Sequence, residues 1–285
     1  MPEYRGNVGN LLQHWVLCEI LAACRDHVRH VAFIDAHSMA PFARQRHEFD
    51  ITSHLFDHVR DRLPGESSFY EESWYTLDPD AKSGGGYPNS ASFLAALWAD
   101  YYSLILCETD LLTVQDLRRW TDEVRRSSPK CLCAEVFHGK WDVRFTQGLP
   151  ASGELAFFSF DPYMFNRNVV KDPKPGNMYP SDLNCVATAV QSISQGIIVQ
   201  LSTYSVNNAN SQEAVIESVR SGLKAAGLDI VATVRANGTS NGLPWQMMSI
   251  VLGRGIAWAD SLRTLESRFK LWLKRAIDEH RVLSR

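Results

Sequence analysis

The stretch Leu155-Ala156-Phe157-Phe158-Ser159-Phe160-Asp161 decides the fold, because an almost unbroken apolar run ends there in a carboxylate. A short apolar run of this kind favours a buried β-strand. Similar runs occur at residues 31–34, which lead into Asp35, and at residues 104–107, which lead into Glu108. Strands that are apolar on both faces are typical of parallel sheets covered by helices on both sides.

Helical and extended patterns alternate outward from these three strands. We expect two more strands and five helices, the strands at residues 131–137 and 196–202 and the helices at 10–25, 90–98, 114–126, 181–194 and 211–226. The first helix is predicted to be amphipathic with Asn10 as its N-cap, and Gly227 is predicted to end the last one. Five β–α alternations predict an α/β protein with a mainly parallel sheet.

The end of the chain breaks this alternation. Residues 229–235 and 246–252 are predicted strands, and the short segment between them has no room for a crossover helix. A parallel connection needs a dozen or more residues, so we expect these two strands to be antiparallel.

The alternation also lapses between residues 42 and 87. Residues 54–60 look helical there, and Ser83-Gly84-Gly85-Gly86 looks like a flexible joint. We therefore expect an inserted helical subdomain at 42–87. Residues 1–41 then supply the first helix and strand of the core, and residues 88–285 supply the remainder.

Composition is that of an ordinary globular protein. The chain has 285 residues, 45% of them hydrophobic, and a formal net charge of −3, so it exerts no global attraction on nucleic acid. Local contacts are possible at residues 44–46 (RQR) and in the loop 166–174, which carries three cations. Each of these stretches is equally compatible with an ordinary solvated loop.

Cellular location and redox state follow from simple features. No apolar run approaches the roughly 18–20 residues that cross a bilayer, and the start of the chain, MPEYRGNVGN, lacks the layout of a signal peptide. We expect a cytoplasmic location. The six cysteines form no C-x₂-C pair, and four lie in apolar runs, so we expect reduced core thiols and no metal site.

The acids at the ends of the predicted strands indicate a ligand site. In an open parallel sheet, ligands bind outside the carboxyl ends of the strands. Asp35, Glu108 and Asp161 share that edge in the predicted topology. An acid after the second strand is the usual partner of a ribose hydroxyl pair, and Glu108 is in that position.

Short motifs over most of the chain resemble those of the RlmJ family, bacterial methyltransferases that act on adenine N6 of 23S ribosomal RNA. Residues 6–14 (GNVGNLLQH) resemble the family's GNHADVLKH, and residues 34–37 (IDAH) its IDTH. Three further motifs follow in the same order and at similar spacing: residues 87–90 (YPNS), 106–108 (LCE) and 160–163 (FDPY), against the family's YPGS, LCE and IDPPY. The D-P-aromatic motif is also similar to one in the three-Cys-motif partner proteins.

The resemblance implies a Rossmann-like class I methyltransferase that uses S-adenosyl-L-methionine (SAM). Its sheet would be mostly parallel with an antiparallel last strand and a helical insertion after the first strand. Its substrate would be an adenine amino nitrogen of nucleic acid, RNA rather than DNA, in a base that is single-stranded or flipped out.

Site residues carry over position by position. Glu108 would hold the ribose, His138-Gly139 would meet the adenine, and Asp161 would accept a hydrogen bond from the target amino group. Pro162 and Tyr163 complete the catalytic motif. The full set of expected cofactor residues is His14, Asp35, His37, Ser90, Glu108, His138 and Gly139.

Alternatives remain at several positions. His14 is as compatible with a packing role as with a cofactor contact, and Asp161 before proline also suits a turn. Asp142 competes with His138 for the adenine position. The aromatic residues at 157–165 are expected mainly in the core, with Tyr163 or Phe165 offering a stacking face.

The loop after the first strand opens an alternative function. The family has a glycine-rich A-G-A-G there, whereas this chain has Ser38-Met39-Ala40-Pro41, with no residue that adopts positive φ cheaply. That loop favours a catalytically silent relative acting as a binding partner. The retained Ser90, Glu108 and Asp161-Pro162-Tyr163 favour the enzyme.

Overall fold

The structure is a computed structural model, and it describes residues 8–42, 70, 88–142, 154–162, 164–167, 176–205, 211–240 and 243–283. Seven strands form one sheet in the order β3-β2-β1-β4-β5-β7-β6. Their bounds are β1 (His30–Asp35), β2 (Tyr101–Glu108), β3 (Cys131–His138), β4 (Leu155–Phe160), β5 (Gly196–Ser205), β6 (Asp229–Ser240) and β7 (Leu243–Arg254).

The sheet is parallel except for β7, which runs antiparallel to both β5 and β6. The predicted α/β class and the antiparallel pair at the end of the chain are therefore confirmed. β1 and β4 are buried along their whole length because both faces of the central sheet are covered. That burial is why their sequences are apolar without alternation.

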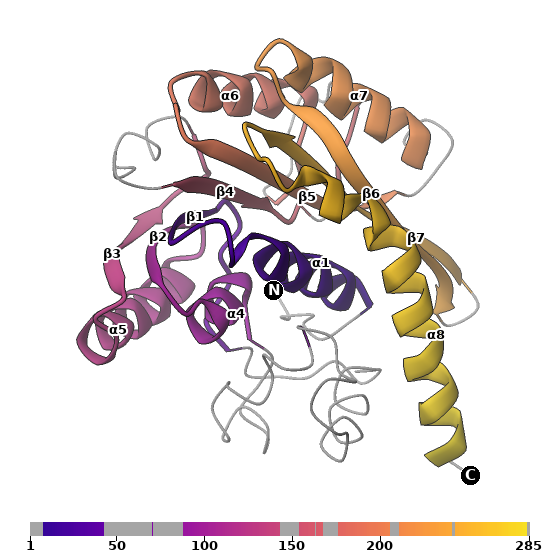
Figure 1. Ribbon diagram of the computed structural model, residues 1–285, viewed down its shortest axis with the longest axis horizontal. Coiled ribbons are helices and arrows are strands. Elements are labelled where there is room, and N and C mark those ends of the chain that lie inside the picture. Colours follow the sequence, from indigo (N-terminus) through magenta and orange to yellow (C-terminus); the bar gives the residue numbers. More distant parts are fainter. Residues whose placement is uncertain are drawn as a thin grey trace.

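Helices cover both faces of the sheet (Figure 1). The helices α6 (Pro180–Gln191) and α7 (Gln212–Lys224) lie on one face, and α1 (Val8–Cys24), α4 (Ser90–Leu97) and α5 (Leu111–Ser127) on the other. Gly227 follows α7 with φ of +71°, a conformation that suits glycine, so its predicted role as a stop is confirmed. None of the described helices is both long enough and apolar enough to cross a membrane.

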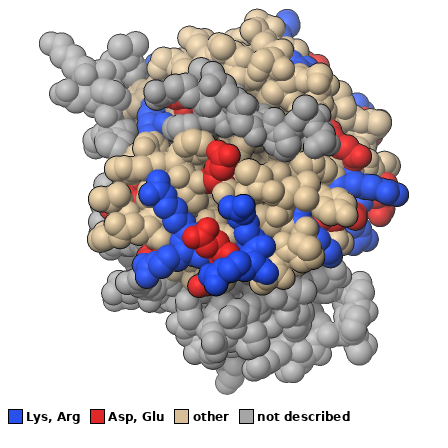
Figure 2. Space-filling view, turned by 90° about the vertical axis from the view of Figure 1, so that its left-hand side faces the viewer, with Lys and Arg blue, Asp and Glu red and all other residues tan. Residues whose placement is uncertain are grey.

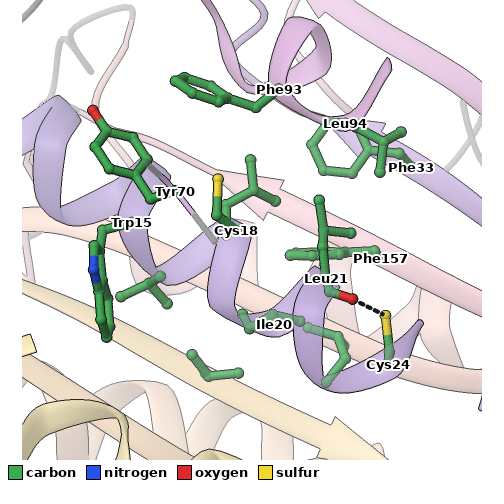
Figure 3. Close-up of a cluster of buried hydrophobic side chains, with 14 of the residues drawn as sticks. Trp15, Cys18, Ile20, Leu21, Cys24, Phe33, Tyr70, Phe93, Leu94 and Phe157 are labelled. Atoms are coloured by element: carbon green, nitrogen blue, oxygen red, sulfur yellow. Dashed lines mark hydrogen bonds between the residues drawn. The ribbon is translucent and has the colours of Figure 1, made fainter. Parts of the chain in front are cut away.

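Helix α1 differs from the prediction. It begins at Val8, so Asn10 lies in its first turn and is not the N-cap. Every residue from 11 to 21 is buried, because the helix packs on the sheet beside α4, and Figure 3 shows Phe33, Phe93 and Phe157 around it. The amphipathic assignment is wrong, and α1 is a core helix.

The chain ends in two elements that the sequence patterns did not predict, a 3₁₀ turn η4 (Ala259–Thr264) and helix α8 (Leu265–Leu283). Helix α8 lies beside α1. Its Phe269 and Trp272 rings lie 5.2 Å and 6.1 Å from the ring of Trp15. Arg268 of α8 pairs with Glu19 of α1, whose side chain is 2% exposed.

The predicted insertion falls almost wholly outside the described residues, as does the cation-bearing stretch 44–46. Two of its described residues, Phe42 and Tyr70, contact the core. Phe42 bridges to Pro88, which brings the two ends of the segment together. Tyr70 packs its ring 5.5 Å from Phe93 and 5.9 Å from Trp272. All six cysteines are unpaired, and four are buried.

Candidate functional site

Three carboxylates gather at the carboxyl edge of the central strands. β1 lies between β2 and β4, and Asp35 at its end is aligned with Leu106 of β2 and Ser159 of β4. Glu108 ends β2 and Asp161 directly follows β4. The parallel direction of the strands thus brings three acids that are far apart in sequence to one edge, as predicted.

A cavity opens at this edge. It holds about 250 Å³ of empty space, part of it open to solvent. The residues that line it come from α1, from the loop after β1, from the start of α4 and from the end of β4: Asn10, Gln13, His14, Asp35, His37, Met39, Pro88, Asn89, Ser90 and Asp161. Five of the predicted site residues, His14, Asp35, His37, Ser90 and Asp161, are among them.

Ser90 joins α1 to α4 inside this cavity. Its Oγ lies 3.1 Å from His14 Nε2 and accepts a hydrogen bond of 3.1 Å from Gln13 Nε2. The His14 ring also packs 4.7 Å from the ring of Phe93. His14 therefore packs in the core and also borders the cavity, and its contact with a cofactor stays a prediction.

Asn89 fixes the position of Ser90. Its side chain caps α4 by accepting from Ser92 N at 2.8 Å, and its Nδ2 donates to the Met39 carbonyl at 2.8 Å. An N-cap of this kind stabilises a helix start by about 1 kcal/mol. The same residue thus begins α4 and ties it to the loop after β1.

The loop after β1 is bound to both neighbouring strands. Ala36 N donates to the Ser159 carbonyl of β4, and Ser38 N donates to the Cys107 carbonyl of β2, each at 2.9 Å. Asp35 Oδ1 accepts from His37 N at 3.3 Å. These bonds hold the glycine-free loop down across the strand ends.

His37 is neutral at neutral pH. Its pKa is lowered to about 4, mainly by burial and also by the charge of Lys140, while the carboxylate of Asp182 opposes the shift. Lys140 and Asp182 form an ion pair of 2.8 Å. His37 Nδ1 is buried with no hydrogen-bond partner, so it is available to a ligand.

Glu108, His138 and Gly139 form a second group beside the cavity, and they are not among its lining residues. Glu108 Oε1 accepts from Thr109 N at 2.5 Å and from Asp110 N at 2.9 Å, while Oε2 has no hydrogen bond within the described residues. His138 Nε2 lies 3.1 Å from the Thr109 carbonyl. Gly139 N donates to the Glu108 carbonyl at 2.8 Å, with φ of +150° at Gly139.

Asp142 lies close enough to the same edge to act on Cys107. Burial is the main cause of the raised pKa of Cys107, and the charges of Asp35, Asp142 and Glu108 add to it. Asp142 therefore remains an alternative to His138 on this side of the site.

The D-P-Y motif is only partly described. Asp161 lines the cavity and is half-buried, Pro162 is buried, and Tyr163 lies outside the described residues. Phe165 is fully buried, and its backbone N donates to Thr203 Oγ1 at 2.8 Å. The prediction that Phe165 offers a stacking face is wrong, because its ring belongs to the core.

Sequence reasoning missed five of the lining residues. Asn10 lies four positions before His14 on the same face of α1, so helical spacing could have identified it, whereas Gln13 gave no such signal. Pro88 and Asn89 precede Ser90 directly. Met39 gave no signal, because a methionine in a loop has no distinctive chemistry.

Charges on the outer edge of the sheet are mixed. Helix α5 exposes Arg118, Arg119, Arg125 and Arg126 together with Asp122 and Glu123. Figure 2 shows this side of the molecule, where basic side chains gather around acidic ones. The described part of this face therefore presents no field of one sign to a phosphate backbone. Of the predicted contact loop 166–174, only residues 166 and 167 are described.

Comparison with known proteins adds a likeness in fold. No family model matches the chain, and no curated protein matches its sequence. The crystal structure of protein LPL1258 from Legionella pneumophila str. Philadelphia 1 aligns with a TM-score of 0.58 at 15% identity, covering 95% of this chain and 92% of that chain. At that identity the likeness concerns the fold alone.

Two more distant structures also align. TYW2 from M. jannaschii, solved in complex with AdoMet, gives a TM-score of 0.40 at 7% identity, covering 89% of this chain and 78% of that one. An rRNA methylase from Streptococcus thermophilus gives 0.37 at 11% identity, covering 85% and 96%.

Proposed function

We propose that the protein is a SAM-dependent methyltransferase that transfers a methyl group to an adenine amino nitrogen of nucleic acid, RNA rather than DNA. One observation carries the proposal: Asp161 lines the same cavity as His14, Asp35, His37 and Ser90. Glu108 ends β2, which lies two strands from β4 in the sheet. The usual strand spacing therefore puts the end of β2 about 10 Å from the end of β4. Several described residues of the motifs that resemble the RlmJ family thus lie at one edge of the sheet.

The residues present fit the cofactor. The cavity offers buried atoms without partners, Gln13 Oε1 and His37 Nδ1, and Glu108 Oε2 beside it has no hydrogen bond within the described residues. The space of about 250 Å³ at this edge includes open solvent, so the described residues form an open cleft. It would hold the amino-acid end of the cofactor, and the nucleoside would lie toward Glu108 and Gly139.

The bound cofactor would supply a methyl group on a sulfonium, which is already a good leaving group. The chain's own task is then to position the acceptor. Asp161 would accept a hydrogen bond from the target amino group, so that the nitrogen lone pair points at the methyl. Its carboxylate is also placed to hold the proton that the nitrogen releases. The target base would have to leave its stack to reach a half-buried carboxylate.

A second candidate function is that of a catalytically silent protein that keeps the methyltransferase fold and acts as a binding partner. The loop after β1 favours it, because Ser38 N is bonded to the Cys107 carbonyl and the loop contains no glycine. Such a loop has less freedom to admit a cofactor than the family's glycine-rich loop.

Calorimetric titration with SAM separates the two. We expect micromolar binding by the full chain, loss of binding in Glu108→Ala, and retained binding in Glu135→Ala, an exposed glutamate on the neighbouring strand β3. Asp161→Ala should keep SAM affinity within a few-fold and lose methyl transfer to unstructured RNA.

The outcomes are distinct. If the wild-type protein binds no SAM, the silent relative is the better description. If Asp161→Ala transfers methyl groups as fast as the wild type, Asp161 does not orient the acceptor. Transfer to DNA in place of RNA would correct the substrate and leave the site intact.

A further inference from the structure

Gln13 is buried, and only the nitrogen of its side-chain amide has a hydrogen-bond partner. Its side chain is 3% exposed, and Nε2 donates to Ser90 Oγ at 3.1 Å. Its Oε1 is buried without a hydrogen-bond partner, although the residue lines the cavity. A buried acceptor without a partner costs about 1–3 kcal/mol, so a ligand that supplies the missing N–H gains that much by satisfying it.

The surroundings of Gln13 select the kind of ligand. Asp35 and Asp161 line the cavity, and no lysine or arginine is among the described residues that do so. His37, whose pKa is lowered to about 4 mainly by burial, stays neutral. Two carboxylates and an unpaired amide oxygen suit a cationic group with several N–H donors, and they disfavour a phosphate.

Gln13 is held in place from behind. Gln200 of β5, which is fully buried, donates through Nε2 to the Gln13 carbonyl at 2.8 Å and lies 3.2 Å from Ser249 Oγ. Ser202 Oγ donates to Ser249 Oγ at 3.0 Å. This buried polar network holds the backbone of α1 at Gln13, and the hydrogen bond to Ser90 Oγ orients its side-chain amide.

We propose that Gln13 is a specificity residue of this cavity, whose Oε1 accepts a hydrogen bond from the ammonium group at the amino-acid end of the cofactor. The inference rests on the proposed function above and deepens it, since it distinguishes adenosyl ligands with an amino-acid end from those without one. Asp35 supplies the compensating charge, and Ser90 keeps the Gln13 amide oriented.

The test compares two ligands on two variants. S-adenosylhomocysteine carries the ammonium group, whereas 5′-methylthioadenosine has the same nucleoside and thioether without the amino-acid end. Gln13→Met, which keeps the shape and removes the acceptor, should weaken S-adenosylhomocysteine binding about tenfold, the equivalent of about 1.4 kcal/mol, and change 5′-methylthioadenosine binding by less than about twofold. Gln13→Glu keeps an acceptor and should retain the preference for S-adenosylhomocysteine.

Gln212→Met is the matched control. Gln212 is also a buried glutamine, but it lies on α7 and bonds to the Met247 carbonyl at 2.9 Å, away from the cavity. The control should bind both ligands as the wild type does. Calorimetry on the full-length protein measures all the affinities.

Three results would overturn the inference. Equal loss of both ligands in Gln13→Met would show that Gln13 only shapes the site, and unchanged binding of S-adenosylhomocysteine would show that its oxygen faces something else. In both cases the proposed function survives, because the wild type still binds. Failure of the wild type to bind either ligand removes the proposed function and this inference together.

Discussion

His37 makes the stability of the fold depend on pH. Its pKa is about 4 in the folded protein, mainly because burial disfavours the charged ring, against an ordinary value of 6.5. Between these two values the unfolded chain binds a proton that the folded protein does not. The free energy of unfolding therefore falls as pH drops from about 6.5 to about 4, and this contribution is constant above that window.

We expect His37→Gln to remove that part of the pH dependence. Urea titrations at several pH values from 7 to 4 measure it, because the midpoint reports the free energy of unfolding when its slope is unchanged. The wild type should lose more stability than the variant over this range. Parallel loss in both proteins would mean that the His37 ring is charged in the folded state.

Single residues with distinctive chemistry were predictable from the sequence. The acids Asp35, Glu108 and Asp161 stood out because each ends a strand, and parallel strands bring such ends together. Gln13 was not predictable, because a glutamine within a helix differs from a solvated one only in what surrounds it. Its burial depends on α4 and β5, which are distant in sequence.

At the level of elements, the sequence analysis was wrong about the environment of α1 and did not predict α8. Apolar residues at helical spacing predicted α1 as an amphipathic helix, yet its polar residues Gln13, His14 and Glu19 are buried. Each of them bonds to a neighbouring element instead. Helix α8 carries Leu265, Phe269 and Trp272 on one buried face, a helical spacing that was there to be found.

The ion pair between these helices should matter more than a surface pair. Glu19 is 2% exposed in its side chain, while its partner Arg268 is 48% exposed and also lies 6.0 Å over the Trp15 ring. Arg268→Ala leaves a buried carboxylate without this partner, and we expect a loss of about 2–4 kcal/mol in the free energy of unfolding.

Lys270→Ala is the control for that change. Lys270 pairs with Glu266 one turn away at the surface of the same helix, so its removal should cost at most about 1 kcal/mol. Denaturant unfolding of both variants measures the difference. Equal small losses would mean that water reaches Glu19 as easily as Glu266.

At the scale of the whole molecule, the alternation of strands and helices predicted the class of fold but not the order of its strands. The position of each strand in the sheet matches how deeply it is buried. β1 and β4 lie at the centre, whereas β3 at one edge exposes Leu132 and Glu135. The chain runs outward from β1 to β2 to β3 and then returns to β4 and β5, and the helices α5 and α6 that follow β2 and β4 lie on opposite faces.

The candidate site lies where the two halves of the sheet meet, β3-β2-β1 on one side and β4-β5-β7-β6 on the other. Its residues come from α1, β1, β2, β4 and α4, and the hydrophobic clusters on the two faces of the sheet both reach the edge that carries it. A ligand bound there contacts elements from both halves. We therefore expect ligand binding to stabilise the sheet as one cooperative unit.

Thermal unfolding with S-adenosylhomocysteine tests this expectation. At a hundred times its dissociation constant, a ligand that binds only the folded state adds about 2.7 kcal/mol, which corresponds to roughly 5–10 °C in a chain of this size. The whole transition should move as one, and Glu108→Ala at the same concentration should not move. Adenosine triphosphate should also leave the transition in place, because the described cavity lining has no lysine or arginine to neutralise its phosphates. An equal shift with the triphosphate would point to a general nucleotide site, and a split transition would show that the ligand stabilises only part of the sheet.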